Sequence, residues 1–320
     1  AGVDALRSPP RTRLPVNWLV SALQKNVRRM RGPSAVRVVA EILRRAANPL
    51  EGLRIVVRRL VIIMVEDAVV HPAVPLAVWT MLAMTRDYVP PDMLLGALLR
   101  VVWEVAQVPL REDSAYAPPL GDLLHPPSTR VVGGAKTHID RAFARCLLVR
   151  AEYGGMKGDV TMLRRCARSW EQRLKTDSRW HEWLRRTHHH TDDPCGDFPP
   201  IEWLQIAPLV ASDIPLAALD FHCTDITTRV IRRVGVSCLR SVVQLQGLST
   251  VGVGDVVRQA IWQHRSSVNY RAPLHEQVEM ETPPPKRMKH SSQETILTNV
   301  WQRIEPSVTA ETLLMRSRFV

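Results

Sequence analysis

Two adjacent acids, Glu66 and Asp67, stand near the end of the segment RRLVIIMVEDAVVHP, and paired carboxylates can do acid–base chemistry. The helical pattern from Pro49 runs into the apolar residues of this segment without an intervening Gly or Pro, which predicts a helix with a buried second half. The acids then lie at the C-terminal end of that helix, where the helix dipole disfavours negative charge. We therefore expect both to pair with arginines of neighbouring helices and to be architectural, not catalytic.

Two segments contain the residue types of cofactor sites without the required spacing. VVGGAKT (131 to 137) suggests a phosphate-binding loop, but that loop needs glycine directly before the lysine and again five positions earlier. Those positions hold Ala135 and Arg130, so we predict a plain loop. HHHTDDPC (188 to 195) contains metal-ligand residue types, yet three consecutive histidines cannot all face one ion, and no second ligand pair follows at zinc-finger spacing. We expect a polar loop there, and no metal or other cofactor.

The segment LDFHCTDITTRVIRR (219 to 233) has helical spacing that brings His222 and Asp225 together. A His–Asp pair can act as a catalytic dyad when it has a nucleophile or a metal to activate. The sequence offers neither, so a structural histidine bonded to its neighbours is the favoured interpretation. An enzyme that uses this pair remains the third function considered.

The segment DVVRQAIWQHRSSVNYR (255 to 271) predicts a helix with a basic and aromatic face. That face carries Arg258, Trp262, Arg265 and Asn269, while Val257, Ile261 and Val268 pack inward. Arginine and an amide can hold phosphates, and an exposed indole can stack on a base. The alternative is a half-buried tryptophan covered by the stems of surface arginines.

Charge is unevenly distributed along the chain. The formal net charge is +12, and residues 1 to 64 hold 13 basic residues against 3 acidic ones. From Val16, apolar residues recur at helical spacing, and the opposite face carries basic residues that include Lys25, Arg28 and Arg31. Arg29 and the pair Arg58–Arg59 add to this basic character. Such asymmetry is typical of a surface that meets a polyanion, most often nucleic acid.

The fold class predicted is mainly α, a helical bundle followed by further helical blocks. Gly32-Pro33 should end the first helix, with Ser34 as the N-cap of the next. The predicted organisation, in chain order, is an irregular lead-in (1–15), a basic helical bundle (16–110), a linker (111–137), a basic helical block (138–186), a His/Asp/Pro-rich loop (187–200), a helical block (201–272), a disordered segment (273–294) and a C-terminal helix (295–320).

Several features indicate an intracellular protein. The five cysteines are odd in number and scattered, which fits a reducing compartment better than a disulfide framework. No apolar run approaches the roughly 18 residues of a membrane-spanning helix, and the N-terminus lacks a signal-peptide core. The short basic stretch PPPKRMK, Pro283 to Lys289, resembles a nuclear-import signal and slightly favours the nucleus.

Three segments in order, SALQKNVRR (21 to 29), AVRVVAEILRRAANP (35 to 49) and RRLVIIMVEDAVVHP (58 to 72), resemble the C-terminal helical region of replication-associated recombination ATPases. These clamp-loader relatives include the bacterial MgsA/RarA type and the Werner-helicase-interacting ATPase. In that family the region drives oligomerisation beside an ATPase module. The resemblance covers about a third of the chain, and no phosphate-binding loop precedes the helices. It therefore implies a clamp-loader-like fold and a link to DNA transactions, but not ATP hydrolysis. The family-like positions are Lys25, Arg28, Arg58, Arg59, Glu66 and Asp67, the two acids serving as helix or subunit contacts.

The leading function is a non-catalytic, helical nucleic-acid-binding protein in DNA replication, recombination or repair. DNA is favoured over RNA as its partner, a homo-oligomer is allowed, and no membrane is expected. The alternative is an RNA-binding or scaffold subunit of a ribonucleoprotein or protein complex. On the leading hypothesis, reversing Arg28 and Arg29 to glutamate should weaken binding and leave the fold intact.

Overall fold

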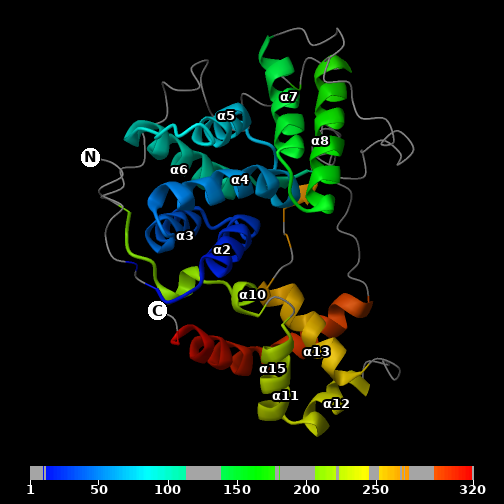
Figure 1. Cartoon of the computed structure of the whole chain (residues 1–320). Helices are drawn as coiled ribbons and strands as arrows, with labels where there is room; N and C mark the ends of the chain where they lie inside the picture. The colour runs from blue at the N-terminus through cyan, green and yellow to red at the C-terminus, as the bar shows by residue number, and fades with distance from the viewer. Residues whose placement is uncertain are drawn as a thin grey trace.

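A computed structural model describes residues 10, 12–112, 138–176, 180, 206–220, 223–244, 252–266, 269, 271–273 and 292–318. The protein is mainly α-helical, which confirms the predicted fold class (Figure 1). Its helices form two lobes with separate hydrophobic cores. In the described part of the chain, no helix combines the length and the apolar character needed to cross a lipid bilayer.

The N-terminal lobe is a bundle with a helical pair beside it. The bundle consists of α2 (Val16–Arg28), α3 (Gly32–Arg45), α4 (Pro49–Asp67), α5 (Val74–Met84) and α6 (Asp92–Gln107). The helices α7 (His138–Glu152) and α8 (Lys157–Thr176) stand side by side next to it (Figure 1). Phe143 of α7 and Trp170 of α8 join the same core as the bundle, so this pair belongs to the N-terminal lobe.

The C-terminal lobe is built from shorter helices around one long one. The 3₁₀ turn η4 (Ala211–Asp213) and α10 (Leu216–Leu219) connect the lobes, because Ile214 and Ala218 belong to the N-terminal core and Leu216 to the C-terminal core. The helices α11 (Thr224–Val234), α12 (Val236–Gln244) and α13 (Val253–Ile261) follow. A π-helical turn, η5 (Trp262–Ser266), extends α13. The long helix α15 (Ser292–Arg316) packs on α11, α12 and α13. A terminal helix was predicted for 295 to 320, and α15 agrees with it.

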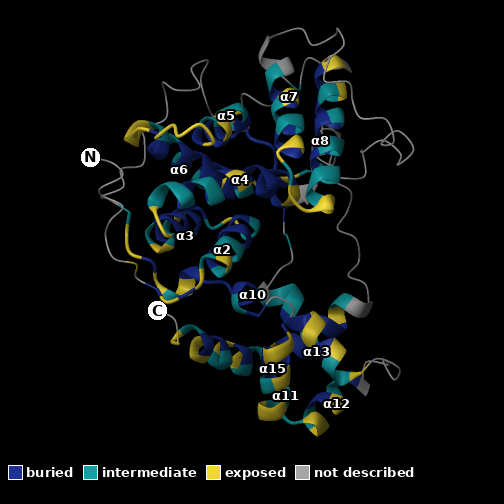
Figure 2. Cartoon of the chain, in the orientation of Figure 1, coloured by how far each residue is buried: buried dark blue, intermediate teal, exposed yellow. Residues whose placement is uncertain are grey.

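The segment with the two acids is a helix, as the continuity of its pattern predicted. The side chain of Asn48 accepts a hydrogen bond from the Glu51 amide at 2.8 Å and caps the start of α4, while Pro49 occupies the first turn. Every residue from 60 to 65 is buried, so the second half of α4 runs through the middle of the bundle (Figure 2).

Two boundaries differ from the predictions. Ser34 is not an N-cap, because α3 already begins at Gly32 with Arg31 in the capping position and Pro33 in the first turn. The helix predicted for 255 to 271 ends at Ser266, and Asn269 lies outside it. Tertiary contacts account for the second difference, because the side chains of Asn269 and Arg271 donate to the Asp67 carbonyl of the N-terminal lobe.

Arg271 ties the C-terminal segment to the ends of two bundle helices. Its guanidinium donates to the carbonyls of Val105, Ala106 and Val108 at the end of α6, and to that of Asp67 at the end of α4, over 2.7–3.1 Å. Next to it, β2 (Ala272–Pro273) pairs in parallel with β1 (Leu110–Arg111). Helix ends leave carbonyls without partners, and this arginine supplies their donors.

Candidate anion-binding pocket

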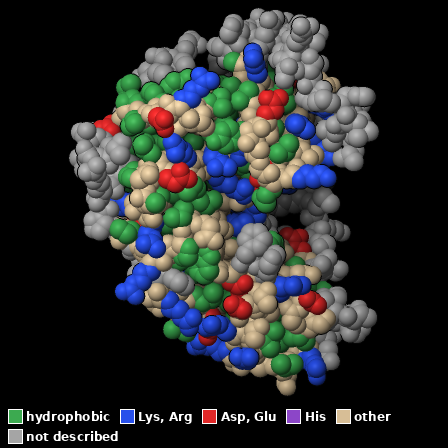
Figure 3. All heavy atoms as spheres, viewed as in Figure 1, with side chains coloured by type: hydrophobic (Ala, Val, Ile, Leu, Met, Phe, Trp, Pro, Cys, Tyr) green, Lys and Arg blue, Asp and Glu red, His purple; other side chains and the backbone are tan. Residues whose placement is uncertain are grey.

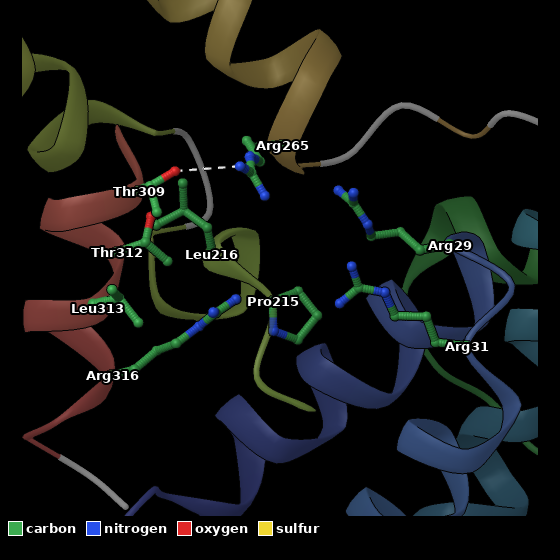
Figure 4. A pocket seen from close by; sticks show the side chains of 9 residues that line it. All are labelled: Arg29, Arg31, Pro215, Leu216, Arg265, Thr309, Thr312, Leu313 and Arg316. Atoms are coloured by element: carbon green, nitrogen blue, oxygen red, sulfur yellow. Dashed lines mark hydrogen bonds between the residues drawn. The ribbon is translucent and has the colours of Figure 1, made fainter. Parts of the chain in front are cut away.

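Where the two lobes meet, four arginines and two threonines surround a small pocket (Figure 4). The nine residues that line it are Arg29, Arg31, Pro215, Leu216, Arg265, Thr309, Thr312, Leu313 and Arg316. The arginine side chains extend from opposite sides toward the space beside Pro215 (Figure 4). Its volume is about 70 Å³. A pocket of this kind is suited to a compact anion, not to a drug-sized molecule, for which pockets of roughly 300–1,000 Å³ are typical.

The N-terminal lobe supplies Arg29 and Arg31 from a tight turn between α2 and α3. Met30, between them, takes a left-handed backbone conformation with φ of 55°. The amide of Arg31 donates to the carbonyl of Asn26 at 2.9 Å, which closes the C-terminal turn of α2. Both arginines are half-buried and project from the end of the basic helix.

The C-terminal lobe supplies Arg265 and Arg316. Arg265 pairs with Glu305 at 3.1 Å, donates to the Thr309 hydroxyl at 3.2 Å and lies 5.6 Å from the ring centre of Trp301. Arg316 donates through Nε to the carbonyl of Ile214 at 2.8 Å. Burial, and then the like charges of Arg31, Arg265 and Arg29, lower the pKa of Arg316 to about 10. A bound anion would offset this repulsion.

Pro215 and Leu216 form the apolar wall of the pocket. An ion pair of Asp213, which precedes them in the sequence, holds this segment on the bundle. Arg37 of α3 donates to both carboxylate oxygens of buried Asp213, through Nε at 2.7 Å and Nη2 at 2.6 Å. The Asn26 amide donates to the Asp213 carbonyl at 2.7 Å. Burial alone would raise the pKa of Asp213, but the hydrogen bonds from Arg37 and from the Val210 amide outweigh it, so the pKa lies below its ordinary value. This pair fixes Pro215 and Leu216 against the bundle.

Three arginines that the sequence singled out for nucleic-acid binding come together here. Arg29 and Arg31 were chosen for the basic N-terminal helix and Arg265 for a separate basic face, and all three line the pocket. Sequence reasoning missed Arg316, Thr309 and Thr312. They lie on the predicted C-terminal helix, whose mixed pattern carries no signal for a site. Only the tertiary fold, which places the end of α15 across the pocket from the turn after α2, brings them together.

The acids at the end of α4 are paired with an arginine of a neighbouring helix, as the helix-dipole argument predicts. Arg28 of α2 contacts Asp67, with an Nε–Oδ1 distance of 2.5 Å, and approaches Glu66 at 3.7 Å. Gln24 donates to both carboxylates, at 2.9 Å to Glu66 and 2.7 Å to Asp67. Burial and then the neighbouring Asp67 raise the pKa of Glu66. Asp67 is only 1% exposed, which favours an architectural role.

Lys25 was expected on the exposed basic face, and this expectation is wrong. It is 2% exposed, because the bundle covers the side of α2 that bears Gln24 and Lys25. Burial, followed by the charge of Arg28, lowers the pKa of Lys25 to about 8. A lysine in this position contributes to the polar interior around Glu66 and Asp67, and it does not reach a nucleic acid.

The other predicted contact residues are scattered over the molecule. Arg58 is exposed and lies over the Tyr153 ring at 5.3 Å. Arg59 pairs with Glu66 at 3.5 Å and with Asp159 at 3.6 Å. Arg258 is exposed and pairs with Asp255 at 2.8 Å. None of these lines the pocket.

Trp262 and Asn269 have structural surroundings. The indole of Trp262 is half-buried against the C-terminal core, in line with the alternative of a packed tryptophan. The amide of Asn269 donates to the Asp67 carbonyl at 2.8 Å, and its side-chain oxygen accepts from the Arg271 amide at 3.2 Å. The expectation of one continuous face with Arg258, Trp262, Arg265 and Asn269 is therefore wrong, since Asn269 turns back to the N-terminal lobe.

Most of the remaining candidates lie outside the described residues. Asp225 is exposed in the first turn of α11, and His222 lies outside the described residues. The segments 131 to 137, 188 to 195 and 283 to 289 also lie outside them. Within the described ranges, no group of His, Cys, Asp or Glu side chains is arranged to hold a metal ion.

Comparison of the chain with models of protein families, with curated proteins and with solved structures gave no match.

Proposed function

We propose that this protein is a non-catalytic nucleic-acid-binding protein that holds a phosphate group in the pocket between its lobes. The observation that supports this is the convergence of Arg29, Arg31, Arg265 and Arg316 on one small space. Arginine is suited to this task because its planar guanidinium forms charge-assisted, bidentate hydrogen bonds with phosphate oxygens. Thr309 and Thr312 add hydroxyl groups to the same wall.

The charge of the chain supports a long anionic partner. The net charge is +12, and Lys and Arg side chains gather along the lower left edge of the face in Figure 3. A nucleic acid carries regularly spaced phosphates, so one phosphate in the pocket leaves others to meet this basic surface. The resemblance of the N-terminal helices to recombination ATPases favours DNA and a role in replication, recombination or repair, and oligomerisation through the bundle would follow from it.

Binding should weaken steeply as salt is raised. Each neutralised phosphate is expected to contribute about 0.9 to the log–log slope of affinity against salt on duplex DNA, and about 0.7 on single strands. Fluorescence anisotropy with single-stranded DNA, duplex DNA and RNA at several salt concentrations measures this slope. Tight binding with a steep slope is the expected result.

The three nucleic acids separate the related hypotheses. Stronger binding to RNA than to either DNA would favour the ribonucleoprotein alternative. If none of the three binds at low salt, the proposed function is wrong, and the pocket must serve an anionic group of another kind.

A further inference from the structure

We infer that the pocket recognises the terminal phosphomonoester of a nucleic acid strand in preference to a phosphodiester within the strand. This inference rests on the proposed function and names the ligand of the same pocket.

The volume of the pocket limits what can enter it. At about 70 Å³ it takes a single phosphate group, whereas the sugar and base must stay outside. An internal phosphodiester has two ester oxygens, and both must lead back out through the mouth to the rest of the strand. A terminal phosphate is attached through one ester oxygen only, so it can enter further and present its other three oxygens to the walls.

The charge of the pocket matches a dianion better than a monoanion. A phosphodiester carries one negative charge, whereas a phosphomonoester carries about −1.5 to −2 at neutral pH. Glu305 offsets part of the charge of Arg265. Among the described carboxylates, none lies within ion-pair distance of Arg31 or Arg316. Arg316 is bonded to a neutral carbonyl, and its lowered pKa reflects burial among like charges.

The donors come from three directions, as the oxygens of a terminal phosphate require. Arg29 and Arg31 approach from the turn after α2, Arg265 from η5 and Arg316 from the end of α15 (Figure 4). The hydroxyl of Thr309 accepts from Arg265, which leaves its own hydrogen for an anion oxygen. Thr312 donates its hydroxyl hydrogen to the Val308 carbonyl at 2.6 Å, so it contributes less. Pro215 and Leu216 form an apolar wall that excludes water from one side.

The test compares short single-stranded DNA oligonucleotides of one sequence, labelled internally, that carry a 5′-phosphate, a 3′-phosphate or hydroxyls at both ends. We expect one or both phosphorylated oligonucleotides to bind roughly tenfold more tightly than the hydroxyl form, a difference of about 1.4 kcal/mol, because the terminal phosphate gains charge-assisted hydrogen bonds that the hydroxyl form lacks. The double variant Arg31→Gln, Arg265→Gln should lose this preference. The matched variant Arg58→Gln, Arg258→Gln removes two arginines outside the pocket and should keep it.

Acidification gives a second measure of the same preference. The second pKa of a phosphomonoester is about 6, whereas the arginines stay protonated, so the preference should shrink when the pH falls below about 6. A terminal preference without this pH dependence would contradict recognition of the dianion.

The outcomes separate this inference from the proposed function. Tight, equal binding of all three oligonucleotides would overturn the end preference and leave nucleic-acid binding in place. No binding to any of them would overturn both. A third outcome would assign the pocket to a phosphorylated protein instead. In it, all three oligonucleotides bind equally, and a phosphoserine peptide displaces them from the wild type but not from the Arg31→Gln, Arg265→Gln variant.

Discussion

Replacing Arg271 with methionine should lower the free energy of unfolding by more than about 3 kcal/mol, because each buried carbonyl left unpaired costs about 1–3 kcal/mol. Arg271 is 2% exposed, and its guanidinium donates to four carbonyls at the ends of α4 and α6. Methionine fills a similar space but donates nothing. Asn269 would still serve the Asp67 carbonyl, while those of Val105, Ala106 and Val108 would lose the Arg271 donor.

Denaturant unfolding followed by circular dichroism measures this loss. Arg240→Met is the control, because Arg240 is exposed on α12 and its replacement should change stability by no more than about 0.5 kcal/mol. Arg271→Lys should fall between the two, since one ammonium cannot span the ends of both helices. Equal denaturation midpoints for Arg271→Met and Arg240→Met would show that the hydrogen bonds of Arg271 contribute nothing to stability.

Replacing Arg37 with methionine should cost about 3–5 kcal/mol, the usual consequence of leaving one partner of a buried ion pair without the other. Asp213 is 1% exposed and receives both of its strongest hydrogen bonds from Arg37. Because a buried pair can often be replaced by apolar residues of similar volume, the double variant Arg37→Met, Asp213→Leu should recover part of the loss. A double variant as unstable as the sum of the single variants would contradict a pairwise interaction.

The same pair makes a specific contribution to acid stability. Since the pKa of Asp213 is lower in the folded protein than in the unfolded chain, the pair stabilises the fold fully above the ordinary aspartate pKa. Its contribution is lost as the pH falls through the lower, folded value. The stability difference between the wild type and Arg37→Asn, Asp213→Asn should therefore shrink toward low pH, as unfolding curves at several pH values would record.

The environment of Arg28 changes how the basic helix should be tested. The sequence suggested that reversing Arg28 and Arg29 would weaken binding and spare the fold. Arg28, however, pairs with buried Asp67, so a glutamate there would place a third acid beside Glu66 and Asp67. Loss of binding in that variant would report unfolding, not the loss of a contact. Arg31 and Arg265 are the better choice, because both are half-buried at the pocket wall and neither serves a buried carboxylate.

Local pattern was sufficient to predict the helices but not how they meet. Asn48 and Pro49 mark the start of α4, and the uninterrupted apolar run after Arg59 marks its burial. The spacing of apolar residues in α2 could not predict which of its polar side chains are exposed, because helices that come later in the chain cover Gln24 and Lys25. A polar residue on the outer side of one helix becomes interior when a second helix lies over it.

The pocket shows the same limit at the level of the site. Arg29, Arg31 and Arg265 stood out through local charge, yet nothing in the sequence indicated that they share one space. Arg316 comes 51 residues after Arg265 and has no pattern of its own. Its place depends on the hydrogen bond to Ile214 and on the way Arg37 anchors the segment that includes Asp213.

The most direct test of the pocket as a phosphate site is the affinity for single-stranded DNA of Arg31→Gln, Arg265→Gln, measured beside that of Arg58→Gln, Arg258→Gln. The two variants lose the same charge, and each removes one arginine that pairs with a carboxylate of its own lobe, Glu305 or Asp255. If the pocket holds a phosphate, the first variant should bind roughly tenfold more weakly than the second, with a salt slope smaller by about 0.7, the contribution of one phosphate on a single strand. Equal affinities and slopes would show that DNA meets a diffuse basic surface, and the pocket would not be its site.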